Sequence, residues 1–176
     1  MDFAFRGKNI YYEATGQGKP LVLLNGIMMS TLSWVPFVEA FARGGYQVLC
    51  VDLMDQGRSD AFDAGYGMAD QADMVLALMD SLNLPRFSLL GTSYGGALAL
   101  QIACQAPERV ERLLLSATRC YTDPLFRELC ESWIHASHDP QALYTSTMPL
   151  FYGATFQQQQ SAWMAARRQL LESTAF

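Results

Sequence analysis

The sequence predicts an α/β protein with a mostly parallel β-sheet and helices on both faces. Short apolar segments of strand length alternate with longer segments whose apolar residues recur at helical spacing, the pattern of strands joined by crossover helices. Several strand segments are apolar without interruption, as strands buried on both faces are. The chain has 176 residues, which is long enough for one domain with a substantial core. Because 51% of the residues are hydrophobic, the composition argues against a disordered chain.

The first elements are expected to be two short strands, residues 3–5 and 9–14, joined as a hairpin at Arg6-Gly7-Lys8. After a glycine-rich turn, the uninterrupted apolar run at 21–24 predicts a buried strand that ends at Asn25-Gly26. Apolar residues at helical spacing then predict a helix over 32–43, which two consecutive glycines end.

Four more elements complete the expected sheet and its helices. Tyr46–Val51 is a strand, 68–82 is a helix with Pro85 beyond its end, and 87–90 is a buried strand. A helix of small residues is expected over about 95–106, before Pro107, and Val110–Ser116 is the sixth and last strand. The α/β part is therefore predicted to cover residues 1–118.

Residues 119–176 are predicted to be a separate, helical part. Asp123-Pro124 is typical of an N-cap followed by proline at the first helical position. A second helix is expected over 155–171, whereas 143–152 are ambiguous because Pro149 interrupts them.

Charge and composition exclude several classes of protein. The chain carries 12 Lys and Arg against 17 Asp and Glu, a net charge of −5, which argues against binding nucleic acid or another polyanion. No apolar run reaches the roughly 18 residues of a membrane span, and Asp2 stands where a signal peptide has basic residues, so we expect a cytoplasmic protein that does not bind membranes. The four cysteines lack metal-ligand spacing, so we expect buried, reduced thiols and no metal site.

The strongest chemical signal is Gly91-Thr92-Ser93-Tyr94-Gly95, a G-x-S-x-G sequence between a predicted strand and a predicted helix. A chain that turns sharply from strand to helix folds over its central residue, so small residues are needed two positions before and after it. The turn exposes the serine hydroxyl, and the helix N-terminus directs free N–H groups at a developing oxyanion. We favour this interpretation of Ser93 as a nucleophile over the alternative of a simple tight turn.

With these motifs the sequence resembles the α/β-hydrolase superfamily along essentially its whole length. Leu23-Leu24-Asn25-Gly26 is similar to the family's oxyanion loop, and residues 52–60 are similar to its Asp-x-x-Gly-His-Gly-x-Ser loop. The resemblance implies that Ser93 is the nucleophile, that Gly91 and Gly95 shape the elbow, and that the backbone N–H groups of Ile27 and Tyr94 form the oxyanion hole. It also implies an incomplete α/β-hydrolase core followed by the start of a helical cap, with no metal or organic cofactor.

Two departures from the family pattern stand in these loops. Asn25 stands where histidine is usual, and Asp55-Gln56 replaces the common Gly-His pair. We interpret Asn25 and Gln56 as loop residues that hydrogen bond to nearby backbone, although an effect on loop packing and substrate choice stays open.

The histidine and acid that a serine nucleophile needs are missing at their expected places. After Ser93 the only histidines are His135 and His138, and the family's acid and histidine follow two later strands that this sequence lacks. We therefore expect both histidines to be partly exposed cap side chains. Since Val110–Ser116 would be an uncovered sheet edge, we expect either a missing C-terminal part of the same protein or a second chain that covers it.

The leading functional hypothesis is a serine hydrolase that acts on a small or medium carboxylic ester through an acyl-enzyme on Ser93, and that is nearly inactive as these 176 residues alone. An acyltransferase of the same superfamily and a non-catalytic binding module are the alternatives. Four aromatic residues of the helical part either line an apolar pocket or pack the helices: Trp133, Phe151, Tyr152 and Trp163.

Overall fold

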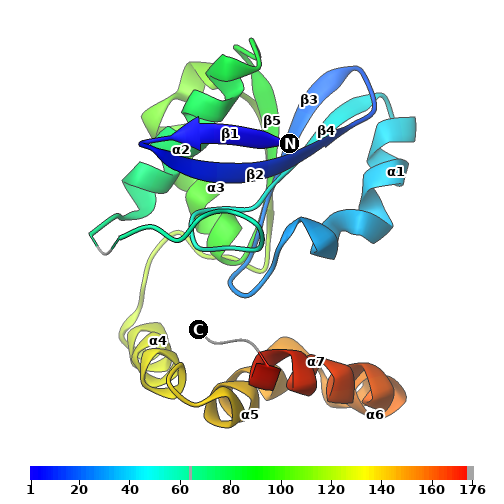
Figure 1. Cartoon of the computed structure of the whole chain (residues 1–176), viewed down its shortest axis with the longest axis vertical. Helices are drawn as coiled ribbons and strands as arrows, with labels where there is room; N and C mark the ends of the chain where they lie inside the picture. The colour runs from blue at the N-terminus through cyan, green and yellow to red at the C-terminus, as the bar shows by residue number, and fades with distance from the viewer. Residues whose placement is uncertain (64, 174–176) are drawn as a thin grey trace. The chain divides into compact units, whose positions relative to one another are not determined.

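The computed structural model describes residues 1–63 and 65–173. Its contacts divide the chain into two compact units, Met1–Cys120 and Tyr121–Phe176, and each unit is described by itself. Figure 1 shows the first unit as a sheet with helices and the second as a group of helices.

The first unit is built on a six-stranded sheet with the order β1-β2-β4-β3-β5-β6. The first two strands pair antiparallel through a turn in which Arg6 and Gly7 both have positive φ, as in the type I′ turn that is common in two-residue hairpins. β2 is antiparallel to β4, while β3 pairs in parallel with β4 and β5, and β5 pairs in parallel with β6. The predicted α/β class with a mostly parallel sheet is confirmed. The strands are β1 (Asp2–Phe5), β2 (Lys8–Thr15), β3 (Lys19–Leu24), β4 (Tyr46–Val51), β5 (Phe87–Thr92) and β6 (Val110–Ser116).

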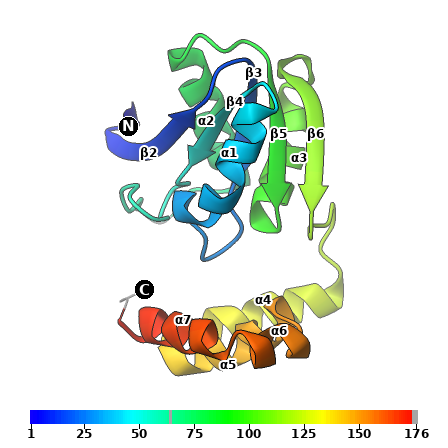
Figure 2. The same ribbon diagram turned by 90° about the vertical axis from the view of Figure 1, so that its right-hand side faces the viewer.

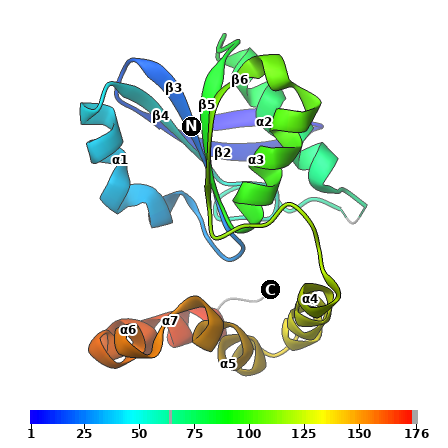
Figure 3. The same cartoon turned by 180° about the vertical axis from the view of Figure 1, so that it is seen from behind.

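Helices cover both faces of this sheet. α1 lies on one face, and α2 and α3 lie on the other, as the two opposite sides of the sheet in Figure 3 show. The chain therefore crosses to one face between β3 and β4 and to the other face between β4 and β5. The helices of this unit are α1 (Val35–Arg43), α2 (Met68–Ser81) and α3 (Tyr94–Gln105), with short 3₁₀ turns at Thr31–Trp34 and Pro107–Arg109.

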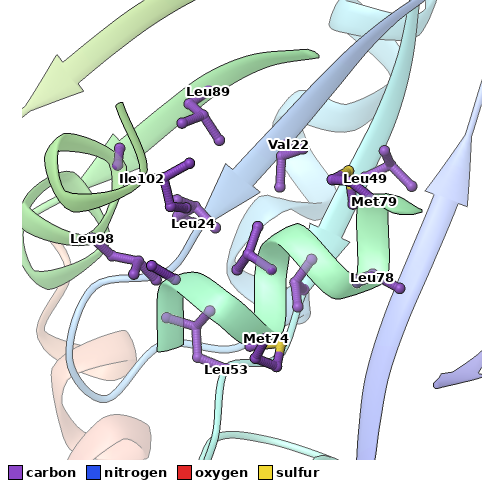
Figure 4. Packing of buried hydrophobic residues seen from close by; sticks show 14 of the residues in the cluster. Val22, Leu24, Leu49, Leu53, Met74, Leu78, Met79, Leu89, Leu98 and Ile102 are labelled. Atoms are coloured by element: carbon purple, nitrogen blue, oxygen red, sulfur yellow. The ribbon is translucent and has the colours of Figure 1, made fainter. Parts of the chain in front are cut away.

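The strand β3 shows how the core forms on both faces. Successive side chains of a strand point to opposite faces, so Leu21 and Leu23 join a smaller cluster with Trp34 of the turn before α1. Val22 and Leu24 join the main cluster instead. In that cluster, leucines and methionines of α2 and α3 pack against the sheet, as Figure 4 shows.

The second unit is a set of four helices. Asp123 caps the first of them, because its side chain accepts a hydrogen bond from the Phe126 N–H, as the sequence predicted. α5 packs against both α4 and α7. The buried apolar side chains in the described part of this unit lie on α5 and α7: Leu143, Tyr144, Met148, Met164 and Leu171. The helices are α4 (Pro124–Ala136), α5 (Pro140–Phe151), α6 (Ala154–Gln159) and α7 (Ser161–Ser173).

The structure resolves one ambiguous segment of this unit and corrects one prediction. The segment 143–152, which Pro149 made ambiguous, lies mostly in α5 with the proline inside the helix. The single helix expected over 155–171 is instead two helices that break at Gln160, whose backbone leaves the helical region (φ −113°, ψ 37°).

Burial differs from the expectation at the cysteines, and it is low around the start of α1. Leu32, Val35 and Phe37, which belong to the helical spacing of the segment 32–43, are exposed. Cys50 is buried, but Cys104 and Cys120 are exposed, so the cysteines are free without all being core residues. Among the described residues, no helix combines the length and hydrophobicity of a membrane span. Figure 2 shows β6 at one side of the sheet, next to β5 only.

Candidate active site

Ser93 lies at the turn between β5 and α3, and its side chain reaches the surface. It is the residue before the first residue of α3, and its backbone is strained, with φ 52° and ψ −116°. A non-glycine residue at positive φ is uncommon and persists only where the surrounding structure holds it. Ser93 is exposed, although Gly91 and Gly95 on either side of it are buried.

Crowding explains why glycine occupies both flanking positions. A Cβ atom on Gly91 would lie 2.2 Å from the carbonyl oxygen of Gly95, and a Cβ atom on Gly95 would lie 2.2 Å from the carbonyl oxygen of Leu24. Both contacts are with backbone, which cannot move aside without shifting β3 or α3. The G-x-S-x-G spacing is therefore a packing requirement of this turn.

The loop after β3 lies against the Ser93 turn. A Cβ atom on Gly26 would lie 3.4 Å from the Ser93 Cβ and 3.5 Å from the Thr92 carbonyl oxygen. β3 and β5 are neighbours in the sheet, and the chain leaves them toward helices on opposite faces. In open parallel sheets such a switch point leaves a crevice at the carboxyl ends of the strands, where ligands bind. The structure thus brings Ser93, Tyr94, Gly26 and Ile27 to one place.

Two backbone N–H groups next to the Ser93 turn are available to a ligand. Within the described part of the chain, neither the Ile27 N–H nor the Tyr94 N–H has a hydrogen-bond acceptor. Tyr94 is the first residue of α3, so its N–H adds to the positive end of the helix dipole. The Ser93 carbonyl is occupied instead, since it accepts a hydrogen bond of 2.8 Å from the Thr118 hydroxyl.

Asn25 and Gln56 form a hydrogen-bonded pair. Asn25 is fully buried; its Nδ2 donates to the Val51 carbonyl oxygen (2.9 Å) and to Gln56 Oε1 (3.1 Å), and its Oδ1 accepts from the Trp34 indole Nε1 (2.6 Å). Gln56 Nε2 donates to the Gly26 carbonyl oxygen at 3.2 Å. Both side chains bond to nearby backbone, as expected, but the sequence did not reveal their bond to each other or the part of Trp34.

Asp52 was also missed as a residue that orders these loops. Its carboxylate is buried and accepts hydrogen bonds from the Thr31 N–H (2.6 Å) and the Arg58 N–H (2.9 Å). A Cβ atom on Gly57, which has positive φ, would lie 2.2 Å from this carboxylate. The Asp-x-x-x-x-Gly spacing after a buried strand is the signal that could have identified this contact.

Two tyrosines near the site stay protonated at neutral pH. Burial raises the pKa of the Tyr94 hydroxyl, and the negative charge of Asp55 adds to this, while a hydrogen bond with Gln71 acts in the opposite direction. Burial, and then the hydrogen bond to Asp55, raise the pKa of Tyr66. Asp55 itself has φ 63° and accepts a hydrogen bond from the Phe62 N–H, so it anchors the loop before α2.

The remaining candidates lie in the second unit. His135 is exposed on α4, where its Nδ1 lies 2.7 Å from the Glu131 carbonyl oxygen, and His138 is exposed just after that helix. The aromatic residues pack as two clusters, with ring centroids 5.5 Å apart for Trp133 and Phe151 and 5.1 Å apart for Tyr152 and Trp163. No group of His, Cys, Asp and Glu suited to a metal ion occurs among residues 1–63 and 65–173.

The sheet is mostly parallel, and a strained serine with a glycine two residues on either side lies between one of its strands and the next helix. This arrangement is typical of α/β proteins whose functional residues lie at the carboxyl ends of the strands. Residues 19–175 match the family described as alpha/beta hydrolase fold. The chain belongs to this family, as its loop and turn sequences predicted.

The sequence matches to curated relatives cover only part of this chain and part of each relative. A putative carbamate hydrolase RutD of Variovorax paradoxus (strain S110) is 37% identical over 109 residues, which are 60% of this chain and 41% of that protein. A 2-hydroxy-6-oxononadienedioate/2-hydroxy-6-oxononatrienedioate hydrolase of Burkholderia vietnamiensis (strain G4 / LMG 22486) is 39% identical over 111 residues, 60% of this chain and 38% of that protein. The matches thus span about two fifths of these curated relatives.

A solved structure is similar over nearly the whole chain. An alpha/beta hydrolase enzyme from a Medee basin deep-sea metagenome library superposes with a TM-score of 0.92 at 32% identity, covering 97% of this chain and 64% of that one. The enol-lactonase from Burkholderia xenovorans LB400 has the same fold, with a TM-score of 0.87 at 24% identity over 99% of this chain and 68% of that one. The chain therefore spans about two thirds of the length of these folded proteins.

Proposed function

We propose that the chain is the nucleophile-bearing part of a serine hydrolase that acts on small or medium carboxylic esters. The observation that carries this proposal is Ser93, an exposed serine at a strained turn beside two backbone N–H groups that have no acceptor in the described chain. Hydrolases among its sequence relatives and structural neighbours support the same reaction class.

In the proposed reaction, the Ser93 hydroxyl oxygen attacks the ester carbonyl carbon while a histidine takes its proton. The Ile27 and Tyr94 N–H groups stabilise the resulting oxyanion. Collapse of this intermediate expels the alcohol, which takes the proton from the histidine, and leaves an acyl group on Ser93. Water, deprotonated by the same histidine, then releases the carboxylic acid.

The histidine and its orienting carboxylate are proposed to come from polypeptide outside these 176 residues. Both histidines that follow Ser93 are exposed side chains of the helical unit. The edge of the sheet gives a reason to expect more polypeptide, because β6 pairs only with β5 among the described strands and its Leu114 and Leu115 are 45% and 43% exposed. A C-terminal part of the same protein, or a second chain, would cover this edge.

The second unit is proposed to be the beginning of a helical cap. Large apolar side chains are exposed on it, among them Leu125 at 81%, Ile134 at 64% and Trp163 at 43%. Exposed apolar side chains of this size are a reason to expect that another surface covers part of this unit.

The nucleophile is tested with a fluorophosphonate probe on the full-length gene product that contains this chain. Labelling is expected at Ser93, and Ser93→Ala should abolish it and lower ester hydrolysis by more than about a thousandfold. Ser132→Ala, which removes an exposed α4 hydroxyl bonded to the Leu129 carbonyl oxygen, is the matched control and should leave both unchanged. Absence of labelling in the unsubstituted protein would favour a non-catalytic binding module, and transfer of the acyl group to an added alcohol in preference to water would favour an acyltransferase.

A further inference from the structure

We infer that Gln56 is a positioning residue for the oxyanion hole: held by Asn25 and Trp34, it fixes the direction of the Ile27 N–H by binding the carbonyl oxygen of the same peptide. This inference rests on the proposed function, because it assigns a task to residues around the proposed Ser93 site. It concerns Asn25 and Gln56, two of the three residues at which the sequence departs from the family pattern.

The geometry of one peptide bond is the first step. The peptide that joins Gly26 to Ile27 is trans and planar, so its C=O and N–H groups point in opposite directions. The Gly26 carbonyl oxygen accepts hydrogen bonds from Gln56 Nε2 (3.2 Å) and from the Met29 N–H (3.3 Å). Because these bonds hold the carbonyl on one side, the Ile27 N–H is directed to the other side.

The hydrogen-bonding capacity of the groups sets the orientation of both side-chain amides. The Trp34 indole can only donate, so the oxygen of Asn25 faces it and the nitrogen of Asn25 faces Gln56. Gln56 must then accept through Oε1 and donate through Nε2, which is what the acceptor-only Gly26 carbonyl requires. Every hydrogen bond from the Trp34 indole to the Gly26 carbonyl therefore has a fixed donor and acceptor. Reversing either amide would place two donors or two acceptors against each other.

Burial makes the Trp34–Asn25 end of this chain of hydrogen bonds resistant to exchange with water, whereas Gln56 is half-buried. Asn25 is 0% exposed and Trp34 is 6% exposed. Their polar atoms would stay without partners if the bonds broke, which costs about 1–3 kcal/mol for each buried group. The Val51 carbonyl oxygen accepts the second hydrogen of Asn25 Nδ2, so the relay is also attached to the end of β4.

The chain of hydrogen bonds from Trp34 to the Gly26 carbonyl ends close to Ser93. Gly26 is buried against the Ser93 turn. Its own N–H donates to the Met29 sulfur at 3.2 Å, so both peptides of Gly26 are tied down. A donor that is already aligned needs no reorganisation when the oxyanion forms, which is the source of its catalytic effect.

The first test is independent of catalysis and uses ¹H–¹⁵N NMR spectra of the 176-residue chain. Gln56→Glu keeps the length of the side chain but removes its donor, so the Ile27 amide peak should shift and broaden while the Trp34 indole peak persists. Gln56→His, which can accept through one ring nitrogen and donate through the other, should restore much of the original Ile27 peak. Gln101→Glu is the matched control, because the Gln101 side chain lies on α3 and donates to Gln105 of the same helix. An Ile27 peak that is unchanged in Gln56→Glu would overturn the inference.

The second test measures ester hydrolysis by the full-length gene product. Gln56→Glu should lower kcat about tenfold or more, since complete loss of one oxyanion donor costs about 10²–10³, and should change KM less than about twofold. Gln56→His should recover part of kcat, which general destabilisation would not produce. A rise in KM at unchanged kcat would overturn the positioning role. If the unsubstituted protein is neither labelled nor active, the proposed function fails, and the NMR comparison still decides whether Gln56 orients the peptide.

Discussion

The centre of the sheet and its β6 edge differ in how completely their residues are buried. β3 pairs with a strand on each side, and its last four residues are buried. β6 has a described partner only in β5, and most of its residues are exposed. With Phe37 and Phe41 of α1, Leu114 and Leu115 line an apolar groove of about 480 Å³. The Ser93 turn thus follows a strand that is paired on both sides, whereas the β6 edge offers unpaired backbone groups to which further polypeptide would bind.

The largest effect is expected at the centre. Gly95→Ala should lower the free energy of unfolding by at least about 3 kcal/mol, because the added Cβ would overlap the Leu24 carbonyl oxygen and push β3 and α3 apart. Gly67→Ala is the control, since Gly67 is exposed, has negative φ and has no atom within 4 Å of the added Cβ; it should cost less than about 1 kcal/mol. Urea denaturation measures both, and equal losses for the two variants would contradict the packing explanation.

The sequence predicted the centre well because its signals are local. An uninterrupted apolar run, a glycine two residues on each side of Ser93 and a helix of small residues follow one another along the chain. Their local geometry follows from steric limits on the turn. The Asp123 N-cap is local in the same sense, since it involves a residue three positions away.

The parts that the sequence did not predict depend on tertiary contacts. The hydrogen bond between Trp34 and Asn25 forms only after the segment before α1 returns to β3, and the bond between Asn25 and Gln56 joins loops 31 positions apart. Apolar spacing likewise could not show that Leu32 and Val35 are exposed, because it does not say how much of a helix its neighbours cover. The Gln160 break between α6 and α7 also lies in a segment whose sequence favours one continuous helix.

A second, smaller effect is expected at Cys50 in β4. Burial, with the nearby charges of Glu13 and Asp52, raises the pKa of its thiol from 9.0 to about 12. Above pH 9 the unfolded chain loses this proton and the folded chain keeps it, so the thiol's contribution to stability should be lost progressively between pH 9 and about 12.

The measurement compares the parent chain with Cys50→Ala by urea denaturation at pH 8 and pH 10. The loss of unfolding free energy between these pH values should be about 1 kcal/mol smaller in Cys50→Ala. Cys104→Ala, at an exposed position on α3, should retain the parent's loss. An identical pH dependence in the parent and Cys50→Ala would show that the centre of the sheet does not hold this thiol in its protonated form.

The smallest change in stability is expected at the β6 edge. A substitution there also tests whether a C-terminal part of the same protein or a second chain covers β6. Leu115→Lys in the 176-residue chain should change the unfolding free energy by less than about 0.5 kcal/mol, because the side chain is 43% exposed. The same charge should suppress self-association through the strand edge, measured by sedimentation over a range of protein concentrations. Ser132→Lys, at an exposed polar position of α4, should leave the association unchanged.

The full-length gene product makes the edge prediction sharper. If a C-terminal part of the same protein covers β6, Leu115 is buried there, and Leu115→Lys should cost several times more stability than it does in the 176-residue chain, because lysine would place an unpaired charge in an apolar contact. If a second chain covers the edge instead, the substitution should convert the full-length product from an oligomer to a monomer at nearly unchanged stability of each subunit. A full-length product that is monomeric and tolerates Leu115→Lys as easily as the shorter chain would show that the β6 edge is open to solvent. The difference in burial between the centre of the sheet and its β6 edge would then also be present in the full-length protein.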